Sequence, residues 1–338
     1  MNDTIYVLVN GYTSTGSSAV LNLFEEYSSI FVPDKEFRLI KDPFGIIDLE
    51  HSLYEATDLL NEDFAIRSFL WFSKKYSKSG KGFRSLGLNY KKDFGTNFYD
   101  KCNQYVKDLI DYEYSSYWWY LSLNKPYLKQ IINKILFKLK IYDTRKHSKM
   151  FLITKPRDEF YNITKDFMDN IFSEIKGNAT FIALDQAIPA THPGLASKYF
   201  HNAKVINVER DPRDVYIDLI TEEKRNGDIV GHVGFDVAST HNVKLFIDWF
   251  KKCRRKGLEG ETLNIYFEDL ILNYEATKKK IFDYIGFDDF DSYLGKRILK
   301  PEISKKNISY WKNYEFQNEI KEIEAALPEY LYMEDKIC

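Results

Sequence analysis

Two glycines and a run of hydroxyl residues near the start of the sequence form its clearest chemical feature. The segment Gly11–Ser18 reads GYTSTGSS. Backbone N–H groups in such a loop wrap around an anion, glycine lets the backbone approach it, and the positive end of a following helix adds attraction. The loop is therefore predicted to bind a phosphate group, and an ordinary strand-to-helix turn with a Ser or Thr N-cap is the alternative. The residues expected to bind the donor here are Ser14, Thr15, Gly16, Ser17 and Ser18.

Position 17 of this loop carries serine, whereas a P-loop enzyme that uses ATP needs lysine there to reach the β- and γ-phosphates. Losing one charge-assisted contact costs roughly 1.5–3 kcal/mol. We therefore expect a nucleotide donor without a γ-phosphate. A P-loop kinase-like phosphotransferase that uses ATP is the weaker alternative.

Two arginines flank a proline much later in the chain. Arg210 and Arg213 lie on either side of Pro212, after a strand that is expected to end at Glu209. Proline suits the first turn of the helix that follows. Guanidinium groups at such a place suit phosphate recognition because they donate several hydrogen bonds in a fixed fork. A cluster of Arg and Asp that caps the helix is the alternative.

The elements that position these residues follow an alternating pattern of strands and helices. A β-rich run at 4–9 precedes the loop, and helical spacing over 17–27 follows it. Because such alternation produces a parallel sheet covered on both faces, we predict an α/β fold with a P-loop-type central parallel sheet flanked by helices. We expect one domain over 1–338 with a large, aromatic-rich helical insertion at about 45–145. Further strands are expected at 28–41, 149–154, 179–184, 204–208 and 263–267.

In their order along the chain, these segments resemble the sulfotransferase family that uses 3′-phosphoadenosine 5′-phosphosulfate (PAPS). Residues 13–18 are similar to that family's loop P-K/R-S-G-T/S-T/S, and residues 210–214 to its R-x-P-R-D turn. Residues 266–270 resemble its YEDL segment, and 305–312 loosely resemble its basic loop before a tryptophan. The style of the motifs is similar to that of carbohydrate, heparan-sulfate-type and bacterial polysaccharide sulfotransferases.

The resemblance implies that the loop at 13–18 holds the 5′-phosphosulfate and that Arg210 holds the 3′-phosphate. It implies PAPS as co-substrate, 3′-phosphoadenosine 5′-phosphate (PAP) as product, and no metal. The other donor-binding residues that it implies are Arg213, Phe267, Lys305 and Lys306.

Two positions depart from the family's pattern. The loop's Lys or Arg falls on Ser14, and losing such a stabilising group costs about 2.7–4 kcal/mol in the transition state. Arg38 and Lys41 are candidates to replace it. The family's serine eight residues after the first arginine falls on Asp218, whose charge opposes a phosphate by roughly 4 kcal/mol at 4 Å and an effective dielectric of 20. Either Asp218 turns away, a nearby cation offsets its charge, or the donor lacks a 3′-phosphate.

Transfer to a hydroxyl needs a base within hydrogen-bond reach of the acceptor. Residues 35–38 read KEFR and resemble the K-E-V/P-H strand of heparan-sulfate-type sulfotransferases, in which the glutamate is the base. The resemblance implies that Glu36, in the second strand, is the general base, and we predict Arg38 as its catalytic neighbour. Simple pairing of Glu36 with Lys35 or Arg38 is one alternative, and His51 as the base is another.

The predicted helical insertion is the expected acceptor-binding layer. Trp118 and Trp119 are candidate platforms for a sugar, with core packing as the alternative for either one. Asp185 and Gln186 follow a strand where related carbohydrate enzymes carry E-K-T-P, and we assign them to substrate binding. Likeness to the carbohydrate branch favours a saccharide or cell-surface glycan precursor as acceptor, and a steroid or phenol is the alternative.

Composition narrows the class of protein. The chain has 338 residues, of which 44% are apolar, so it can bury a substantial core. Its formal net charge of −2 argues against a nucleic-acid partner. Three scattered cysteines indicate a reducing compartment, and no run approaches the ~20 apolar residues of a membrane span. We predict a cytoplasmic enzyme of unknown oligomeric state, with a non-catalytic nucleotide- or glycan-binding homologue as the remaining alternative.

Overall fold

The computed structural model describes residues 4–77, 89–116, 126–140, 148–226 and 242–333. The chain divides into two compact units. The sheet unit comprises residues 1–38 and 172–338, and the helical unit comprises residues 39–171.

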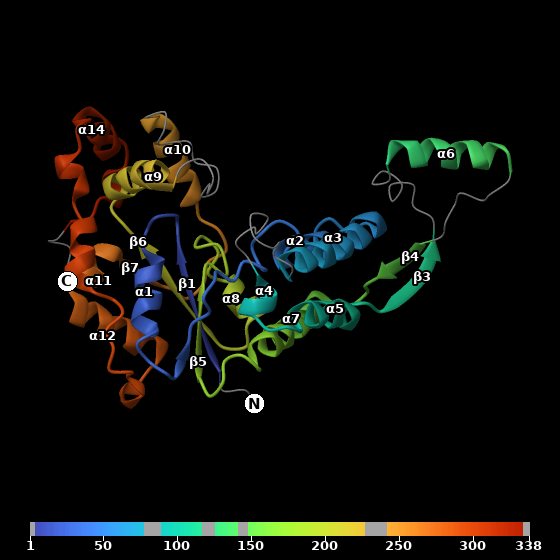
Figure 1. Ribbon diagram of the computed structural model, residues 1–338, viewed down its shortest axis with the longest axis horizontal. Helices are drawn as coiled ribbons and strands as arrows, with labels where there is room; N and C mark the ends of the chain where they lie inside the picture. Colours follow the sequence, from blue (N-terminus) through green and yellow to red (C-terminus); the bar gives the residue numbers. More distant parts are fainter. Residues whose placement is uncertain (1–3, 78–88, 117–125, 141–147, 227–241, 334–338) are drawn as a thin grey trace. The chain divides into compact units, whose positions relative to one another are not determined.

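The sheet unit is built on five parallel strands in the order β2-β5-β1-β6-β7, of which Figure 1 labels β1, β5, β6 and β7. This arrangement confirms the predicted α/β class with a parallel central sheet. The strands are β1 (Ile5–Gly11), β2 (Ile30–Phe31), β5 (Phe181–Asp185), β6 (Ala203–Glu209) and β7 (Leu263–Tyr266). The helices are α1 (Ser17–Phe24), α8 (Leu195–Tyr199), α9 (Pro212–Asn226), α10 (Val243–Cys253), α11 (Phe267–Leu272), α12 (Tyr274–Ile285), α13 (Pro301–Ser304) and α14 (Gln317–Ala326).

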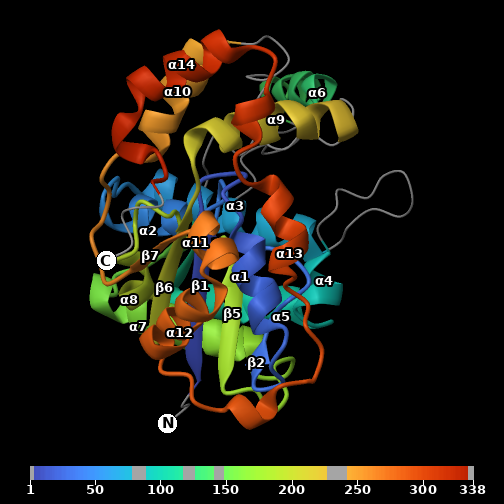
Figure 2. The ribbon, with the colours of Figure 1, turned by 90° about the vertical axis from the view of Figure 1, so that its left-hand side faces the viewer.

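Strand β1 lies in the middle of the sheet and is buried on both faces. Val7 and Val9 pack in one core cluster with α1, α11 and α12, which Figure 2 shows on a single face of the sheet. Tyr6 points to the opposite face, where its ring contacts those of Phe172 and Phe200. A parallel strand must be covered in this way, so its sequence is nearly continuously apolar.

The carboxyl ends of the strands share one edge of the sheet. Val9 pairs with Asp185 of β5, and Glu209 of β6 pairs with Tyr266 of β7. The loops that follow β1, β5, β6 and β7 therefore begin beside one another, and in open α/β sheets this edge is where ligands bind.

The second strand is much shorter than the extended region predicted over 28–41. Strand β2 covers only Ile30–Phe31, and Pro33, which has no N–H to donate, follows soon after it. The expectation that Glu36 lies in a strand was wrong, because its backbone is irregular. The neighbouring Phe37 nevertheless donates its N–H to the carbonyl oxygen of Asp185 at 3.1 Å. The segment is thereby held at the carboxyl end of β5.

The helical unit consists mainly of helices but contains a two-stranded antiparallel sheet. Its strands are β3 (Tyr112–Ser116) and β4 (Ser148–Leu152). The strand predicted at 149–154 therefore exists, but its assignment to the parallel sheet was wrong. A short apolar run does not specify its partner strand, and among the β4 residues whose burial is described only Met150 is fully buried. The helices of this unit are α2 (Ile46–Tyr54), α3 (Leu59–Ser77), α4 (Tyr90–Asp93), α5 (Phe98–Leu109), α6 (Tyr127–Lys138) and α7 (Arg157–Phe172).

Candidate functional site

The loop between β1 and α1 has the backbone of an anion-binding turn. Thr13, Ser14 and Gly16 have φ angles of 76°, 52° and 87°, in the left-handed region. Turns of this kind form concavities lined by backbone N–H groups. Thr13 is β-branched, so its conformation costs about 1–3 kcal/mol, a strain that concentrates at functional sites. The Thr15 hydroxyl closes the loop by accepting a hydrogen bond from the N–H of Tyr12 at 3.2 Å.

Helix α1 begins directly after this loop. Gly16 is its N-cap, and no side chain caps the first turn among the described residues. The positive end of the helix dipole and the amide groups of Ser17 and Ser18 therefore face the same side as the loop amides. The five predicted donor residues thus span the turn at 14–16 and the first two residues of α1, and their contact with the donor stays a prediction.

Gly16 is required by packing as well as by its backbone angle. A Cβ atom at this position would lie 2.5 Å from Cδ2 of Phe267, the residue that opens α11. The loop at 11–18, which we call the donor loop after its predicted ligand, thus packs directly against Phe267. Only glycine at position 16 permits this close approach.

We expect Gly16→Ala to lower the free energy of unfolding by about 2–4 kcal/mol, because it adds the left-handed backbone cost to the clash with Phe267. Chemical denaturation measures this change. Gly177→Ala is the matched control, since Gly177 has a φ of 57° and nothing within 4 Å of its added Cβ. Equal losses in the two variants would show that the Phe267 contact contributes nothing.

Arg210 connects three segments at the carboxyl edge of the sheet. Its Nη1 donates to the carbonyl oxygen of Ser14 at 2.9 Å, and its Nη2 donates to the carbonyl oxygen of Asn307 at 2.9 Å. Its guanidinium lies 5.2 Å from the centre of the Phe267 ring. The loop, the arginine turn, the Phe267 segment and the basic stretch at 305–312 therefore meet around one side chain.

Asp218 also contacts Arg210. Its Oδ2 lies 3.2 Å from Nη1 of Arg210, and the Arg210 side chain is only 5% exposed. Asp218 therefore does not turn away from Arg210, and the other two alternatives stay open. Side chains of a helix point toward its N-terminus, which brings Asp218 of α9 back over the turn that carries Arg210.

Gln186, the residue directly after β5, also contacts the loop between β1 and α1. The Gln186 N–H donates to the carbonyl oxygen of Val9 at 2.9 Å, and its Nε2 donates to the Ser17 hydroxyl at 3.4 Å. Glu36 and Arg38 form an ion pair of 2.9 Å with side chains 42% and 27% exposed. The pairing alternative for Glu36 is thus present in the structure, and its role as base stays a prediction.

Residues 130–292 match the model of the sulfotransferase family. This match covers just under half of the chain and indicates a relationship to the sulfotransferase family. The matched residues include β5, β6, Arg210 and Phe267. The donor loop and the basic stretch at 305–312 lie outside the match, and the contacts of Arg210 connect them to it.

Comparisons with whole proteins add little to this assignment. The sulfotransferase domain from the curacin biosynthetic pathway is 13% identical, with 97% of this chain and 98% of that chain covered and a TM-score of 0.40. Mouse sulfotransferase SULT7A1 complexed with PAP is 14% identical, with 49% and 71% covered and a TM-score of 0.32. Sulfotransferase STF9 from Mycobacterium avium is 10% identical, with 97% and 76% covered and a TM-score of 0.36. No curated protein matches the sequence.

Arg213 is held by acidic side chains. Its Nε and Nη2 donate to the two carboxylate oxygens of Asp211 at 2.9 and 2.6 Å, and its Nη1 donates to Glu324 at 2.7 Å. The guanidinium also lies 3.7 Å from the centre of the Trp311 ring. These contacts favour a structural role for Arg213, and its contact with the donor stays a prediction.

Asp214 fixes the basic stretch to the start of α9. Its carboxylate accepts hydrogen bonds from the N–H groups of Ser309 at 2.7 Å and Trp311 at 3.4 Å. Burial raises the pKa of Asp214, whereas the Ser309 hydrogen bond opposes that shift. Lys305 and Lys306 are exposed beside Asn307, the residue that Arg210 contacts.

Glu268 is a buried acid that sequence patterns did not single out. Its Oε1 accepts a hydrogen bond from the N–H of Asp211 at 2.9 Å, and its Oε2 is buried without a hydrogen-bond partner among the described residues. Burial raises the pKa of Glu268 to about 8. The only available signal was its place in the YFEDL segment.

Because the folded state holds a proton on Glu268 that the unfolded chain releases near pH 4.5, this residue should make stability fall as pH rises from about 4.5 to 8. At about 1.4 kcal/mol per pKa unit, the loss amounts to a few kcal/mol. We expect Glu268→Gln to flatten that slope and to be more stable than the wild type at pH 8. Denaturation at several pH values, with exposed Glu302→Gln as control, tests this expectation. Parallel pH profiles for wild type and Glu268→Gln would contradict it.

Arg254 also supports the donor loop, and the sequence patterns did not identify it. Arg254 donates from Nε and Nη2 to Oε2 of Glu209 at 3.1 and 2.9 Å, and its guanidinium lies 4.2 Å from the centre of the Tyr12 ring. Burial raises the pKa of Tyr12 to about 12. Arg254 therefore links Glu209, at the end of β6, to Tyr12 in the donor loop. No local motif marks Arg254.

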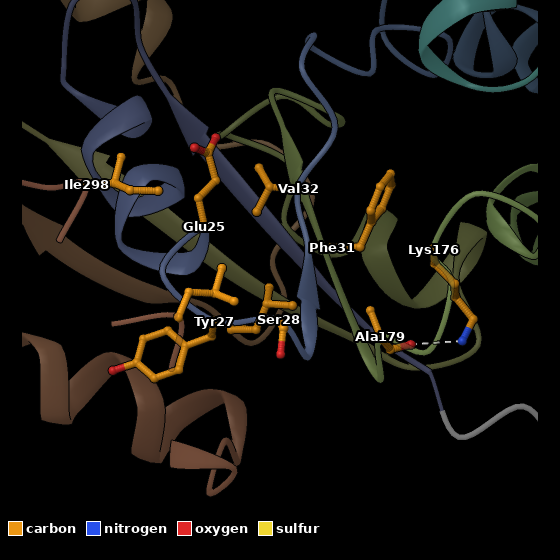
Figure 3. Close-up of a pocket in the computed structure, with 10 residues that line it drawn as sticks. Glu25, Tyr27, Ser28, Phe31, Val32, Lys176, Ala179 and Ile298 are labelled. Atoms are coloured by element: carbon orange, nitrogen blue, oxygen red, sulfur yellow. Dashed lines mark hydrogen bonds between the residues drawn. The ribbon is translucent and has the colours of Figure 1, made fainter. Parts of the chain in front are cut away.

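A cavity of about 310 Å³ lies elsewhere in the sheet unit (Figure 3). Glu25 and Ile298 border it, and so does Ala179, which precedes β5. It therefore opens at the amino end of β5, away from the donor loop. Burial raises the pKa of Glu25, but no predicted site residue lines this cavity.

Trp118 and Trp119 lie outside the described residues. Lys41, one candidate for the missing loop cation, belongs to the helical unit. Within the described parts of the chain, no cluster of three or more His, Cys, Asp or Glu side chains is arranged to hold a metal ion. The helices described also include none with the length and apolar character of a membrane span.

Proposed function

We propose that this sulfotransferase moves a sulfuryl group from PAPS to a hydroxyl of a carbohydrate or cell-surface glycan precursor. The observation that supports this most strongly is the hydrogen bond between Arg210 and Ser14. Because the arginine turn contacts the donor loop, this bond supports the proposal that one adenosine nucleotide binds with its 5′-phosphosulfate at the loop and its 3′-phosphate at Arg210. The free thiols Cys102 and Cys253 are consistent with a cytoplasmic enzyme.

In the proposed reaction, the loop amides and the N-terminus of α1 hold the phosphosulfate of PAPS. The acceptor oxygen attacks sulfur in line while its proton passes to the carboxylate of Glu36. The bond from sulfur to the bridging oxygen breaks, and PAP leaves with the electron pair on its 5′-phosphate. Catalysis of this type depends on positioning and electrostatics, and the reaction as proposed uses no metal.

Arg38 is the proposed source of the positive charge that the loop lacks at Ser14. Its ion pair with Glu36 holds both groups beside the carboxyl end of β5, where the Phe37 N–H bonds Asp185. A guanidinium there stabilises charge on the leaving bridging oxygen.

The acceptor is proposed to contact Asp185 and Gln186, which border the donor loop at the same sheet edge. The helical, aromatic-rich segment at about 45–145, with Trp118 and Trp119, is proposed as the acceptor-binding layer. Aromatic residues suit the apolar faces of sugars, whereas the carboxylate and amide of the β5 end suit their hydroxyl groups. The net charge of −2 favours a glycan over a nucleic acid as partner.

Asp218 is proposed to weaken the binding of the 3′-phosphate by Arg210, because the Asp218 carboxylate already pairs with Nη1 of Arg210. We expect Asp218→Asn to raise the affinity for PAP about tenfold or more, since a like charge beside the phosphate is removed. The affinity for AMP, which has no 3′-phosphate, should stay within about threefold by the same argument.

Isothermal titration calorimetry with PAP and AMP measures both affinities. Asp283→Asn, which removes one exposed carboxylate from a surface pair on α12, is the control for net charge. An unchanged ratio of PAP to AMP affinity in Asp218→Asn would show that Asp218 does not oppose the 3′-phosphate.

Transfer of labelled sulfate from PAPS to a panel of saccharides tests the proposed function directly. Labelled product that depends on the saccharide supports it. Stabilisation by PAP without turnover across a broad panel would instead support a non-catalytic nucleotide-binding homologue, which the pairing of Glu36 with Arg38 favours. Thermal stabilisation by ATP with Mg²⁺ but not by PAP would support a kinase-like phosphotransferase.

A further inference from the structure

Helix α6 of the helical unit carries a continuous apolar stripe on its surface. At about 100° per residue, the side chains of this stripe fall within one half of the helix circumference. Single exposed apolar residues are ordinary, whereas a contiguous stripe marks an interaction surface. Its members are Tyr127, Leu128, Ile132, Ile135 and Leu139, whose exposed fractions are 75%, 74%, 55%, 51% and 60%.

Lysines border this stripe. Helical spacing places Lys134 and Lys138 along one border and Lys129 along the other, and Lys140 follows the helix. All four are exposed, and the sequence from Tyr127 to Lys140 contains no Asp or Glu. A chain with a net charge of −2 thus concentrates four positive charges around one apolar face.

We propose that α6 docks on the surface of an anionic lipid bilayer. The apolar stripe would lie at the boundary between head groups and acyl chains, with the lysine ammonium groups against lipid phosphates. Lysine suits this place because its long stem covers apolar surface while its charge stays in water. The inference concerns the helical unit alone and is independent of the proposed donor chemistry.

Two other partners match only half of this surface. A nucleic acid would attract the lysines but would leave the apolar stripe in water. A second copy of the chain would cover the stripe but would bring like charges together along its borders. An anionic bilayer satisfies both features at once.

Flotation of the full chain with vesicles tests the proposal. We expect the protein to float with vesicles of equimolar phosphatidylcholine and phosphatidylglycerol and to remain unbound with phosphatidylcholine alone. The triple variant Lys129→Gln, Lys134→Gln, Lys138→Gln should bind the anionic vesicles about a hundredfold more weakly, at about fivefold per lysine. The triple variant Leu128→Ser, Ile132→Ser, Ile135→Ser should lose binding altogether.

Two matched variants control for exposed residues in general. Leu245→Ser on α10 removes an apolar side chain that is 45% exposed, and Lys279→Gln on α12 removes an exposed lysine. Both should float like the wild type, and melting curves establish that every variant is folded. The proposal is overturned if the wild type does not float, or if the α6 variants bind as the controls do. Self-association seen by light scattering and abolished in the serine variant, without flotation, would assign the stripe to a second copy instead.

Discussion

Arg210→Ala is expected to abolish measurable binding of PAP. The guanidinium is the proposed partner of the 3′-phosphate, and it also joins the Ser14 and Asn307 carbonyl groups. Removing a buried, charge-assisted donor that serves both roles costs about 3–5 kcal/mol, or more than a hundredfold in affinity. Isothermal titration with PAP measures the loss.

The control for this experiment is Arg255→Ala, which removes an exposed arginine from the segment after α10 and should bind PAP normally. Arg210→Lys separates charge from geometry, since lysine keeps the charge but cannot reach two carbonyl groups in the fork of arginine. A folded Arg210→Ala protein with unchanged affinity would remove the basis for placing the nucleotide between the loop and the arginine turn.

Glu36→Gln is expected to keep PAP binding and to lose turnover by about 10²–10⁴-fold, because glutamine cannot accept the proton of the acceptor hydroxyl. Its shape and its neighbour Arg38 are retained, so binding of the donor should change little. Steady-state sulfate transfer and PAP titration give the two quantities separately.

Asp34→Asn is the matched variant, since Asp34 is an exposed carboxylate two residues before Glu36. It should turn over normally. Near-normal rates in Glu36→Gln would disqualify Glu36 as the base and direct attention to the other acids at the sheet edge. Equal losses in both variants would indicate a general effect of charge on this segment.

The sequence predicted the features of the candidate site that depend on local backbone geometry. Gly16, with its left-handed backbone, and the turn at Arg210 each lie within a few residues of the pattern that predicts them. Such features follow from steric rules that act on neighbours in the chain.

Contacts between distant segments could not be predicted in the same way. Arg254 contacts Tyr12, although the two residues are far apart in the sequence. Glu268 has a raised pKa because neighbours from other elements bury it. The pairing of β4 with β3 is equally non-local, because a β-rich run can join any sheet that offers an edge.

The position of β1 in the middle of the sheet affects how the molecule folds. Its neighbours β5 and β6 follow only after the whole helical unit, so the first strand has no partner while the ribosome is still synthesising that unit. The final contact around Arg210 waits even longer, until Asn307 has emerged. Folding of the sheet unit should therefore be slow and late, and the exposed apolar strand would be a natural substrate for a chaperone that binds nascent chains.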